Sequence, residues 1–176
     1  DNNAYLLACT QTGEALLVDA ANDADRLLAL IEAAGVRLRT IVTTHRHADH
    51  WQALAAVAAA TGATVMAGAP DADALPVPVD RSLEHGDRIE LGASYLSVIA
   101  LRGHTPGSVA LHYRNGADHL FTGDSLFPGG PGKTGSPADF TSLMDDLEAR
   151  VFGALPDSTW VYPGHGDDTT LGAERP

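Results

Sequence analysis

The chain has 176 residues and a formal net charge of −12, with 11 Lys and Arg against 23 Asp and Glu. This length suits one domain with a sizeable core, and the acidic balance argues against nucleic acid or an anionic membrane as the main partner, because both attract basic surfaces. The single cysteine, Cys9, excludes an internal disulfide and a thiolate zinc cluster.

We therefore expect a cytoplasmic protein that binds neither nucleic acid nor membrane. One cysteine suits a reducing compartment, and no apolar run approaches the ~20 residues that a membrane-spanning helix needs. Cys9 itself is expected to be a small buried hydrophobic residue in a strand. The chain starts at Asp1 next to an expected strand, so its ends are expected to be trimmed, and we predict a single domain over residues 1–176. The oligomeric state stays open.

The N-terminal half predicts a hairpin followed by alternating helices and strands. Two short apolar runs flank Thr12 and Gly13, which is typical of a β-hairpin. Asn22 is a candidate cap for the next helix, and Gly35 is expected to end it. The predicted elements are strands at 4–9 and 15–19, a helix at 22–34, a strand at 40–43, a helix at 51–60, a strand at 63–67 and a loop with room for one helical turn at 69–78.

The C-terminal half predicts mostly strands and one long helix. Asn115-Gly116 is a strong hairpin signal, and Ser136 with Pro137 suits the start of a helix. The predicted elements are strands at 88–91, 95–101, 108–113 and 120–122, an irregular segment at 127–136, a helix from 137, and a last strand at 159–162. One face of that helix is expected to be core, and it carries Phe140, Leu143, Met144, Leu147 and Val151.

This order of elements predicts an α/β sandwich. Strands outnumber helices, and the helices come in two sets, one in each half of the chain. Because each sheet must cover an apolar face, two sheets packed together with helices outside them are the natural solution.

Histidine and aspartate gather directly after four of the predicted strands. Five of the eight histidines belong to these clusters. The cluster residues are His45, His47, Asp49 and His50 after 40–43, His104 after 95–101, Asp124 after 120–122 and His165 after 159–162. Since strand ends hold loops rigidly, residues far apart in sequence can meet at one rim of the fold.

The chemistry of these side chains indicates a metal site. Imidazoles and carboxylates suit Zn²⁺, Fe²⁺, Mn²⁺ or Co²⁺, and suit Ca²⁺ poorly. In an extended segment His45 and His47 point the same way, and the turn into the next helix carries Asp49 and His50 away from them. One segment can therefore serve two neighbouring metals, and seven ligands exceed what one tetrahedral metal takes. A lone histidine is more often a satisfied polar residue, but a cluster this dense would repel itself without a cation.

Four motifs resemble those of the metallo-β-lactamase superfamily, and most closely its glyoxalase II-like branch. They are THRHADH at 44–50, GHTPGS at 103–108, FTGDSL at 121–126 and YPGHG at 162–166, so the resemblance spans nearly the whole chain. It implies an αββα sandwich with the site at one edge. It also implies two divalent metal ions, with Zn²⁺ expected and Fe or Mn as alternatives. The implied ligands are His45, His47 and His104 for the first metal, Asp49, His50 and His165 for the second, and Asp124 as the bridge.

The resemblance further implies hydrolysis of a small-molecule thioester. A hydroxide bridging the two metals would attack the carbonyl, with Asp49 and Asp124 as the catalytic carboxylates. Asp124 together with His50 resembles the thioesterases and lactonases, which disfavours β-lactam hydrolysis. We expect no C-terminal helical domain of the kind with which glyoxalase II holds glutathione, so the short glyoxalase II-like hydrolases are the nearer expected match. Lys133 is a candidate for binding an anionic group of a thiol-conjugate substrate, although a solvated surface lysine is nearly as good an interpretation.

Other interpretations stay open. A mononuclear iron persulfide dioxygenase of the same superfamily would use His45, His104 and Asp124. A lactonase or esterase, or a non-catalytic metal-binding module, would use the same cluster. The remaining candidates have a structural interpretation beside a functional one: Thr105 and Ser108 as turn residues or as supports of the His104 loop, and Trp51 and Phe127 in core packing or as walls of the pocket. His85, His112 and His119 are expected on the surface or in a sheet.

Overall fold

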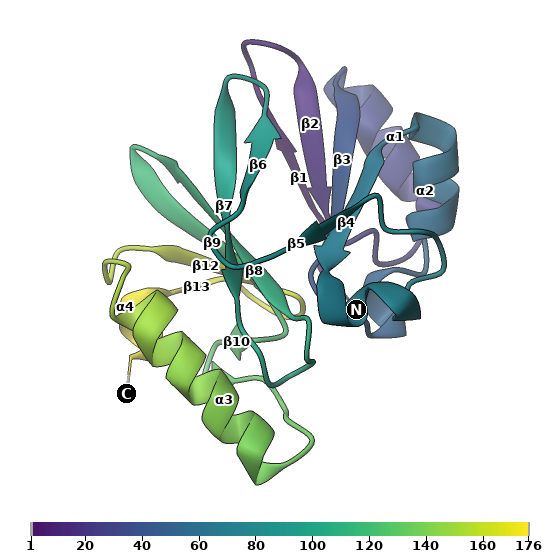
Figure 1. Ribbon diagram of the computed structural model, residues 1–176. Helices are drawn as coiled ribbons and strands as arrows, with labels where there is room; N and C mark the ends of the chain where they lie inside the picture. Colours follow the sequence, from purple (N-terminus) through teal and green to yellow (C-terminus); the bar gives the residue numbers. More distant parts are fainter. Residues whose placement is uncertain (1, 176) are drawn as a thin grey trace.

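Two β-sheets lie face to face at the centre of the fold (Figure 1). The computed structural model describes residues 2–175. The first sheet has the strand order β1-β2-β3-β4-β5, with β1 (Tyr5–Ala8), β2 (Glu14–Val18), β3 (Arg37–Thr43), β4 (Thr64–Gly68) and β5 (Arg81–Leu83). Strands β2 to β5 run parallel, and β1 pairs with β2 antiparallel as the predicted hairpin.

The second sheet is mostly antiparallel and comes from the rest of the chain. Its strand order is β13-β12-β9-β8-β7-β6, with β6 (Arg88–Leu91), β7 (Ser94–Ala100), β8 (Val109–Asn115), β9 (Ala117–Gly123), β12 (Trp160–Pro163) and β13 (Thr169–Thr170). The Asn115-Gly116 hairpin between β8 and β9 is confirmed. Strand β12 pairs parallel with β9, so the loops after these two strands leave the sheet at the same edge.

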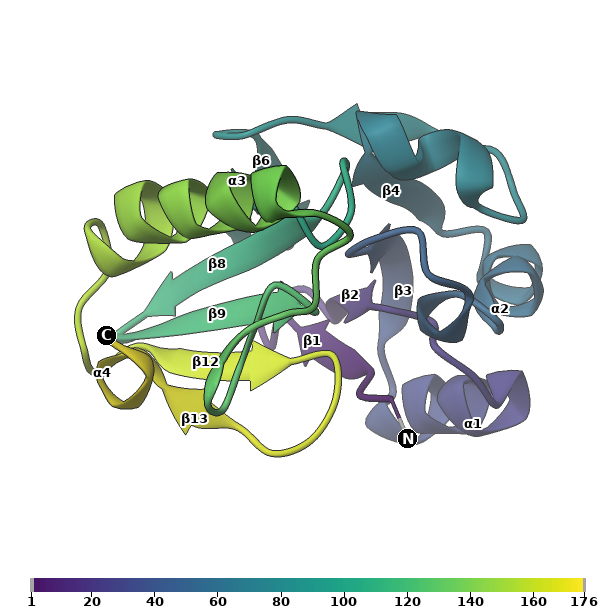
Figure 2. The same cartoon turned by 90° about the horizontal axis from the view of Figure 1, so that it is seen from below.

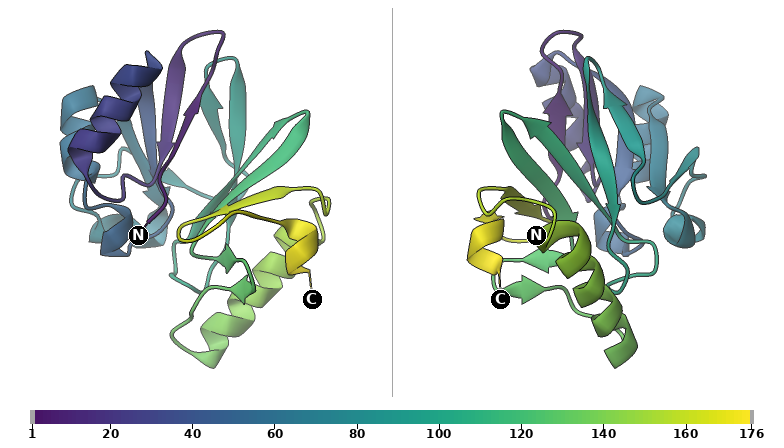
Figure 3. Two further views of the ribbon diagram at one scale, coloured as in Figure 1. Left: turned by 180° about the vertical axis from the view of Figure 1, so that it is seen from behind. Right: turned by 60° about the vertical axis from the view of Figure 1, so that its left-hand side comes forward.

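Helices cover both outer faces, so the predicted αββα sandwich is confirmed (Figures 2 and 3). Helices α1 (Ala24–Ala34) and α2 (Leu54–Thr61) lie on the first sheet. Helix α3 (Pro137–Leu147) lies on the second and continues as a π-helical turn, η3 (Glu148–Phe152). The short elements are the 3₁₀ turns η1 (Ala48–His50) and η2 (Ala69–Ala74), the hairpin β10 (Leu126–Phe127) with β11 (Gly130–Pro131), and α4 (Leu171–Glu174). Within residues 2–175, none of the helices has the length and apolar character needed to cross a bilayer.

The alternation of side chains along the strands produces three apolar layers. In β2, Leu17 faces α1 and α2, whereas its neighbour Leu16 faces the second sheet. A third layer lies between the second sheet and α3, where Leu143, Leu147 and Val151 are fully buried. Burial of both faces of each sheet is what holds the strand ends, and the loops that leave them, in fixed positions.

Several local predictions were wrong. Asp23 rather than Asn22 caps α1, with its side chain accepting from Arg26 N. Phe140 is 48% exposed and does not belong to the core, because it lies on the first turns of α3, before that helix meets the sheet. Cys9 lies just past β1, half-buried in the hairpin turn, rather than buried in a strand.

Other differences concern boundaries and short elements. Helix α2 begins three residues later than predicted, since the chain first makes the 3₁₀ turn η1. The predictions missed β5, the small hairpin β10–β11 in the segment expected to be irregular, and β13 with α4 after the strand expected to be last. All of these elements have two to four residues, which is too short to show a hydrophobic period.

Candidate metal centre

The seven candidate ligands named from the sequence meet at one edge of the sandwich. They leave the carboxyl ends of four strands: the segment from His45 to His50 follows β3, His104 follows β7, Asp124 follows β9 and His165 lies just beyond β12. His45 and His50 are buried, whereas His47 is exposed. The structure therefore brings together the residues that were expected to meet because they follow strand ends.

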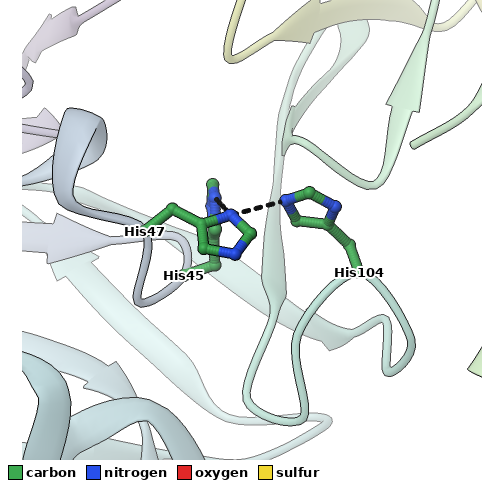
Figure 4. A group of neighbouring side chains, drawn as sticks. All are labelled: His45, His47 and His104. Carbon is green, nitrogen blue, oxygen red and sulfur yellow. Dashed lines mark hydrogen bonds between the residues drawn. The ribbon is translucent and has the colours of Figure 1, made fainter. Parts of the chain in front are cut away.

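Three histidines form the first group (Figure 4). His47 Nδ1 lies 3.1 Å from His45 Nε2 and 3.0 Å from His104 Nε2. The three rings face one another from two separate loops (Figure 4). Three nitrogen atoms that converge in this way can hold one cation.

Asp49, His50 and His165 form a second group beside the first. His165 Nε2 lies 3.2 Å from His50 Nε2 and 3.3 Å from Asp49 Oδ2. The Asp49 side chain is 47% exposed, so this group opens to solvent. The 3₁₀ turn η1 carries Asp49 and His50 away from His47, while the rings of His50 and His45 stay in contact, with centroids 4.1 Å apart.

Asp124 lies between the two groups. Its Oδ2 is 3.7 Å from His104 Nε2 in the first group and 3.5 Å from His165 Nε2 in the second. Its Oδ1 is buried without a hydrogen-bond partner among the described residues, 3.4 Å from His50 Nε2. A buried carboxylate oxygen without a donor is costly unless a cation is nearby. Together with the mixed nitrogen and oxygen donors, this oxygen fits a site for divalent transition metals.

The charges in the cluster also suit a cation. Burial, together with the neighbouring His50 and His104, lowers the pKa of His45 far below its ordinary value. Burial and His104 likewise lower the pKa of His47. Burial works to lower the pKa of His50, but the neighbouring carboxylates of Asp124 and Asp19 outweigh it and raise the pKa to about 10. The lowered pKa values keep His45 and His47 neutral, as metal ligands must be. The raised pKa of His50 reflects the negative potential of two carboxylates, which would equally attract a metal cation in place of the proton.

Asp19 supports the second group and was not singled out from the sequence. Its buried carboxylate accepts from Thr44 N at 2.7 Å and from Thr44 Oγ1 at 2.8 Å, and it lies 2.9 Å from His50 Nδ1. A proton on His50 Nδ1 leaves Nε2 free to point at the second group. Asp19 has a φ of 57°, a conformation rare outside glycine. The signal that could have found it is an Asp directly after a buried strand.

Backbone groups and an asparagine complete the surroundings. The Lys133 carbonyl accepts from His104 Nδ1 at 2.7 Å, while the Lys133 side chain is exposed. Asn2 Nδ2 donates to Asp49 Oδ2 at 2.9 Å and lies 3.5 Å from His50 Nε2 and 3.4 Å from His165 Nε2. Neither contact was visible in the sequence, because each joins segments that lie far apart in the chain.

Close packing around Asp124 requires a glycine at position 164. A Cβ on Gly164 would collide with Asp124 Oδ1 and lie 2.6 Å from His50 Cε1. Only glycine therefore lets the loop that carries His165 pack against Asp124.

Residues expected to be structural make local contacts. Thr105 Oγ1 and Ser108 Oγ are 2.7 Å apart within the His104 loop. His112 pairs with Asp118 at 2.8 Å, and His119 lies 2.9 Å from Tyr162 Oη. His85 lies on the surface. None of the three histidines outside the cluster belongs to a metal-competent group within residues 2–175.

Known proteins resemble this chain both in sequence and in fold. A hydroxyacylglutathione hydrolase from Fuscovulum blasticum is 42% identical over 167 residues, which cover 94% of this chain and 62% of that protein. The chain thus spans about three fifths of the length of such relatives. The structure of TTHA1623 in a di-iron-bound form is 34% identical with a TM-score of 0.80, over 98% of this chain and 91% of that one.

A further solved structure and a family match lead to the same assignment. The BLEG-1 B3 metallo-beta-lactamase has a TM-score of 0.89 at 29% identity, over 98% of this chain and 90% of that one. The family described as the metallo-beta-lactamase superfamily matches residues 1–165. The four sequence motifs and the sandwich agree with that match, and the chain belongs to the metallo-β-lactamase superfamily.

Proposed function

We propose that this protein is a metal-dependent hydrolase that cleaves a thioester of a small thiol. The observation that carries the proposal is the pair of three-residue groups with Asp124 between them. The hydroxyacylglutathione hydrolase relative, 42% identical, supports a thioester as the substrate class.

The proposed ligands follow from the two groups. His45, His47 and His104 would hold one divalent cation, and Asp49, His50 and His165 a second. Asp124 would bridge them, since its two oxygens face both groups. We propose Zn²⁺ for both positions, and the di-iron form of TTHA1623 makes iron the first alternative.

The chemistry of the proposed reaction divides between the cations and the protein. Cations held by these residues would lower the pKa of a bound water molecule and polarise a carbonyl oxygen. Asp49 accepts a hydrogen bond from the attacking water and orients it, while Asn2 holds the Asp49 carboxylate. His47 is exposed, so we infer that a substrate approaches from its side of the cluster.

Lys133 is the proposed contact for an anionic substrate group. It is the only lysine of the chain, and its carbonyl lies against His104, so its side chain leaves the backbone beside the first group. An ammonium group there would attract a carboxylate in a protein with a net charge of −12.

The test combines metal analysis with a matched set of substrates. We expect two divalent cations per chain and cleavage of a hydroxyacylglutathione that stops on chelation and returns with Zn²⁺. The same acyl group on a smaller thiol, the matching oxygen ester and a β-lactam serve as comparisons, and we expect the β-lactam to stay intact. A metal-replete protein that cleaves neither thioester would overturn the proposal.

A mononuclear iron dioxygenase is the second candidate. His45 Nε2 and His104 Nε2 both face Asp124 Oδ2, at 4.0 and 3.7 Å, which suits a two-histidine, one-carboxylate iron site. This interpretation leaves Asp49, His50 and His165 without a role, so we favour the hydrolase. One iron per chain with oxygen uptake on glutathione persulfide would favour the dioxygenase instead.

The expected cellular location and the expected number of domains stay predictions. We propose a cytoplasmic location, which cell fractionation can test. We also propose that residues 1–176 fold as one domain, and a single cooperative unfolding transition is expected.

A further inference from the structure

A buried carboxylate behind the first group has no role in the proposed reaction. Asp71 lies in η2, after β4, and is 1% exposed. It accepts from Arg46 N at 3.0 Å, from Gly107 N at 3.0 Å and from Thr105 Oγ1 at 2.5 Å. Its charge is thus compensated by three hydrogen bonds and by the more distant Arg46 guanidinium, 4.0 Å away.

These donors belong to the two loops that carry the first group. Arg46 lies between His45 and His47, and its backbone N–H is the donor. Thr105 and Gly107 follow His104 in the other loop. One carboxylate therefore ties together two loops that are separated by more than fifty residues of sequence.

The packing around Asp71 leaves little freedom. A Cβ on Gly107 would lie 2.7 Å from Asp71 Cγ and 2.7 Å from Asp71 N, so only glycine fits there. Thr105 is held in turn by Ser108, whose Oγ accepts from Thr105 N at 3.1 Å. A displacement of the carboxylate would thus move both loops rather than be absorbed by a side chain.

We propose that Asp71 is a positioning residue that sets the distance between the His45–His47 loop and His104, and thereby the affinity of the first cation position. The inference rests on the proposed function and its metal centre. The hydrogen bonds of Asp71 go to the backbone and to Thr105, so it acts on the imidazoles through the chain on either side of them. Loss of partners that orient metal ligands costs about 10–100-fold in metal affinity.

The test compares two variants in which a buried aspartate is replaced by asparagine, which has nearly the same shape. Asp71→Asn keeps the shape but replaces one acceptor oxygen by a donor, so three donors can no longer be satisfied. Asp19→Asn is the matched control, because Asp19 contacts His50 of the second group. Each full-length chain is freed of metal and titrated with Zn²⁺ alone against a chelator. Histidine ring ¹⁵N signals identify which imidazoles respond.

We expect Asp71→Asn to weaken the binding that shifts the His45, His47 and His104 signals by about 10–100-fold. Binding that shifts His50 and His165 stays within about threefold of wild type, and Asp19→Asn shows the opposite pattern. Wild-type affinity at the first position, or an equal loss at both positions that follows a loss of folding stability, would overturn the proposal.

A milder pair of variants keeps the test decisive if Asp71→Asn does not fold. Thr105→Val removes one donor to Asp71, whereas Thr105→Ser retains the hydroxyl. We expect Thr105→Val to weaken the first position selectively and Thr105→Ser to restore it, and equal behaviour of the two would contradict the inference. Failure of the proposed function is distinguishable, since it would appear in the wild type as absent Zn²⁺ binding or absent thioester cleavage.

Discussion

The first sheet with α1 and α2 contributes four candidate ligands from one short segment, His45 to His50, whereas the second sheet contributes three from three separate loops. The two regions also hold their residues differently. Buried carboxylates, Asp19 and Asp71, anchor the segment from outside it. In the second region a carbonyl fixes His104, and close backbone approach at Gly164 fixes the neighbourhood of Asp124.

The difference follows from what each region must do. A contiguous segment has to aim its side chains at two neighbouring positions, so its backbone needs anchors on both sides. A residue at the end of a buried strand is already oriented by the sheet, so it needs fewer anchors; the His104 loop is held by the Lys133 carbonyl and, through Thr105 and Gly107, by Asp71. Carboxylate substitutions should therefore weaken metal binding in the first region, and backbone substitutions should do so in the second.

The largest effect is expected from removing one ligand in each region. His45→Ala and Asp124→Ala should each lower thioester hydrolysis by about 1,000-fold or more, since the cation positions lose a donor that helps to create the nucleophile. Far-ultraviolet circular dichroism should still show the folded state. His112→Ala, in a sheet pair with Asp118, is the control. Full activity in either ligand variant would contradict the assignment.

Two glycine variants test the expectation that backbone substitutions disturb the second region. Gly164→Ala should lower activity by roughly 100-fold, because the new Cβ displaces the Asp124 carboxylate and the His50 ring. Gly166→Ala is the control, since Gly166 has a positive φ but a Cβ added there would meet no described heavy atom within 4 Å. It should cost about 1–2 kcal/mol of stability, because a left-handed backbone disfavours any residue with a Cβ. Equal activity losses in the two variants would mean that strain in the loop, rather than the collision, is responsible.

The next largest effect is expected at Asp19, one of the buried carboxylates that anchor the first region. Asp19→Asn should weaken Zn²⁺ binding by about 10–100-fold, because His50 loses the acceptor that fixes its tautomer. Asparagine tolerates the left-handed backbone at this position, so the fold should persist. Chelator competition measures the affinity, and a thermal melt of the metal-free protein serves as the control. Unchanged affinity would show that the carboxylate does not orient His50.

The smallest effect is expected at a buried carboxylate of the second region. Asp146 accepts from Arg102 N, Nε and Nη2 at 2.8–3.0 Å, near the start of the His104 loop. Asp146→Asn should lower stability by about 1–3 kcal/mol at pH 7. Zn²⁺ affinity should stay within about threefold of wild type, because the carbonyl of Lys133 still holds His104. A large loss of affinity would remove the distinction between the two regions.

The pH dependence of this last variant has a definite sign. Burial works to raise the pKa of Asp146, but hydrogen bonds from Arg102 outweigh it and hold the pKa below its usual value. The stabilisation is therefore present above the unfolded pKa of about 4 and is lost as the pH falls through the lower folded value. Urea unfolding of wild type and Asp146→Asn should converge as the pH falls below about 4.

The sequence predicted the sandwich and the grouping of the seven ligands because both depend on local signals. Alternating apolar residues define the strands, and the motifs follow them directly. The roles of Asp19, Asp71 and the Lys133 carbonyl could not be predicted, since each depends on contacts between segments distant in the chain. Phe140 shows the limit of periodicity, because a helical stripe can extend beyond the sheet that it covers.

The contact between Asn2 and Asp49 has a practical consequence for handling the protein. The Asn2 side chain lies within hydrogen-bond distance of Asp49 and His165, so a tag joined at this end of the chain is attached close to the cluster. Affinity tags with several histidines would then compete for the same cations and distort titrations. Attachment after Arg175, whose side chain contacts Phe152 and Asp157, keeps a tag at a different part of the surface (Figure 1).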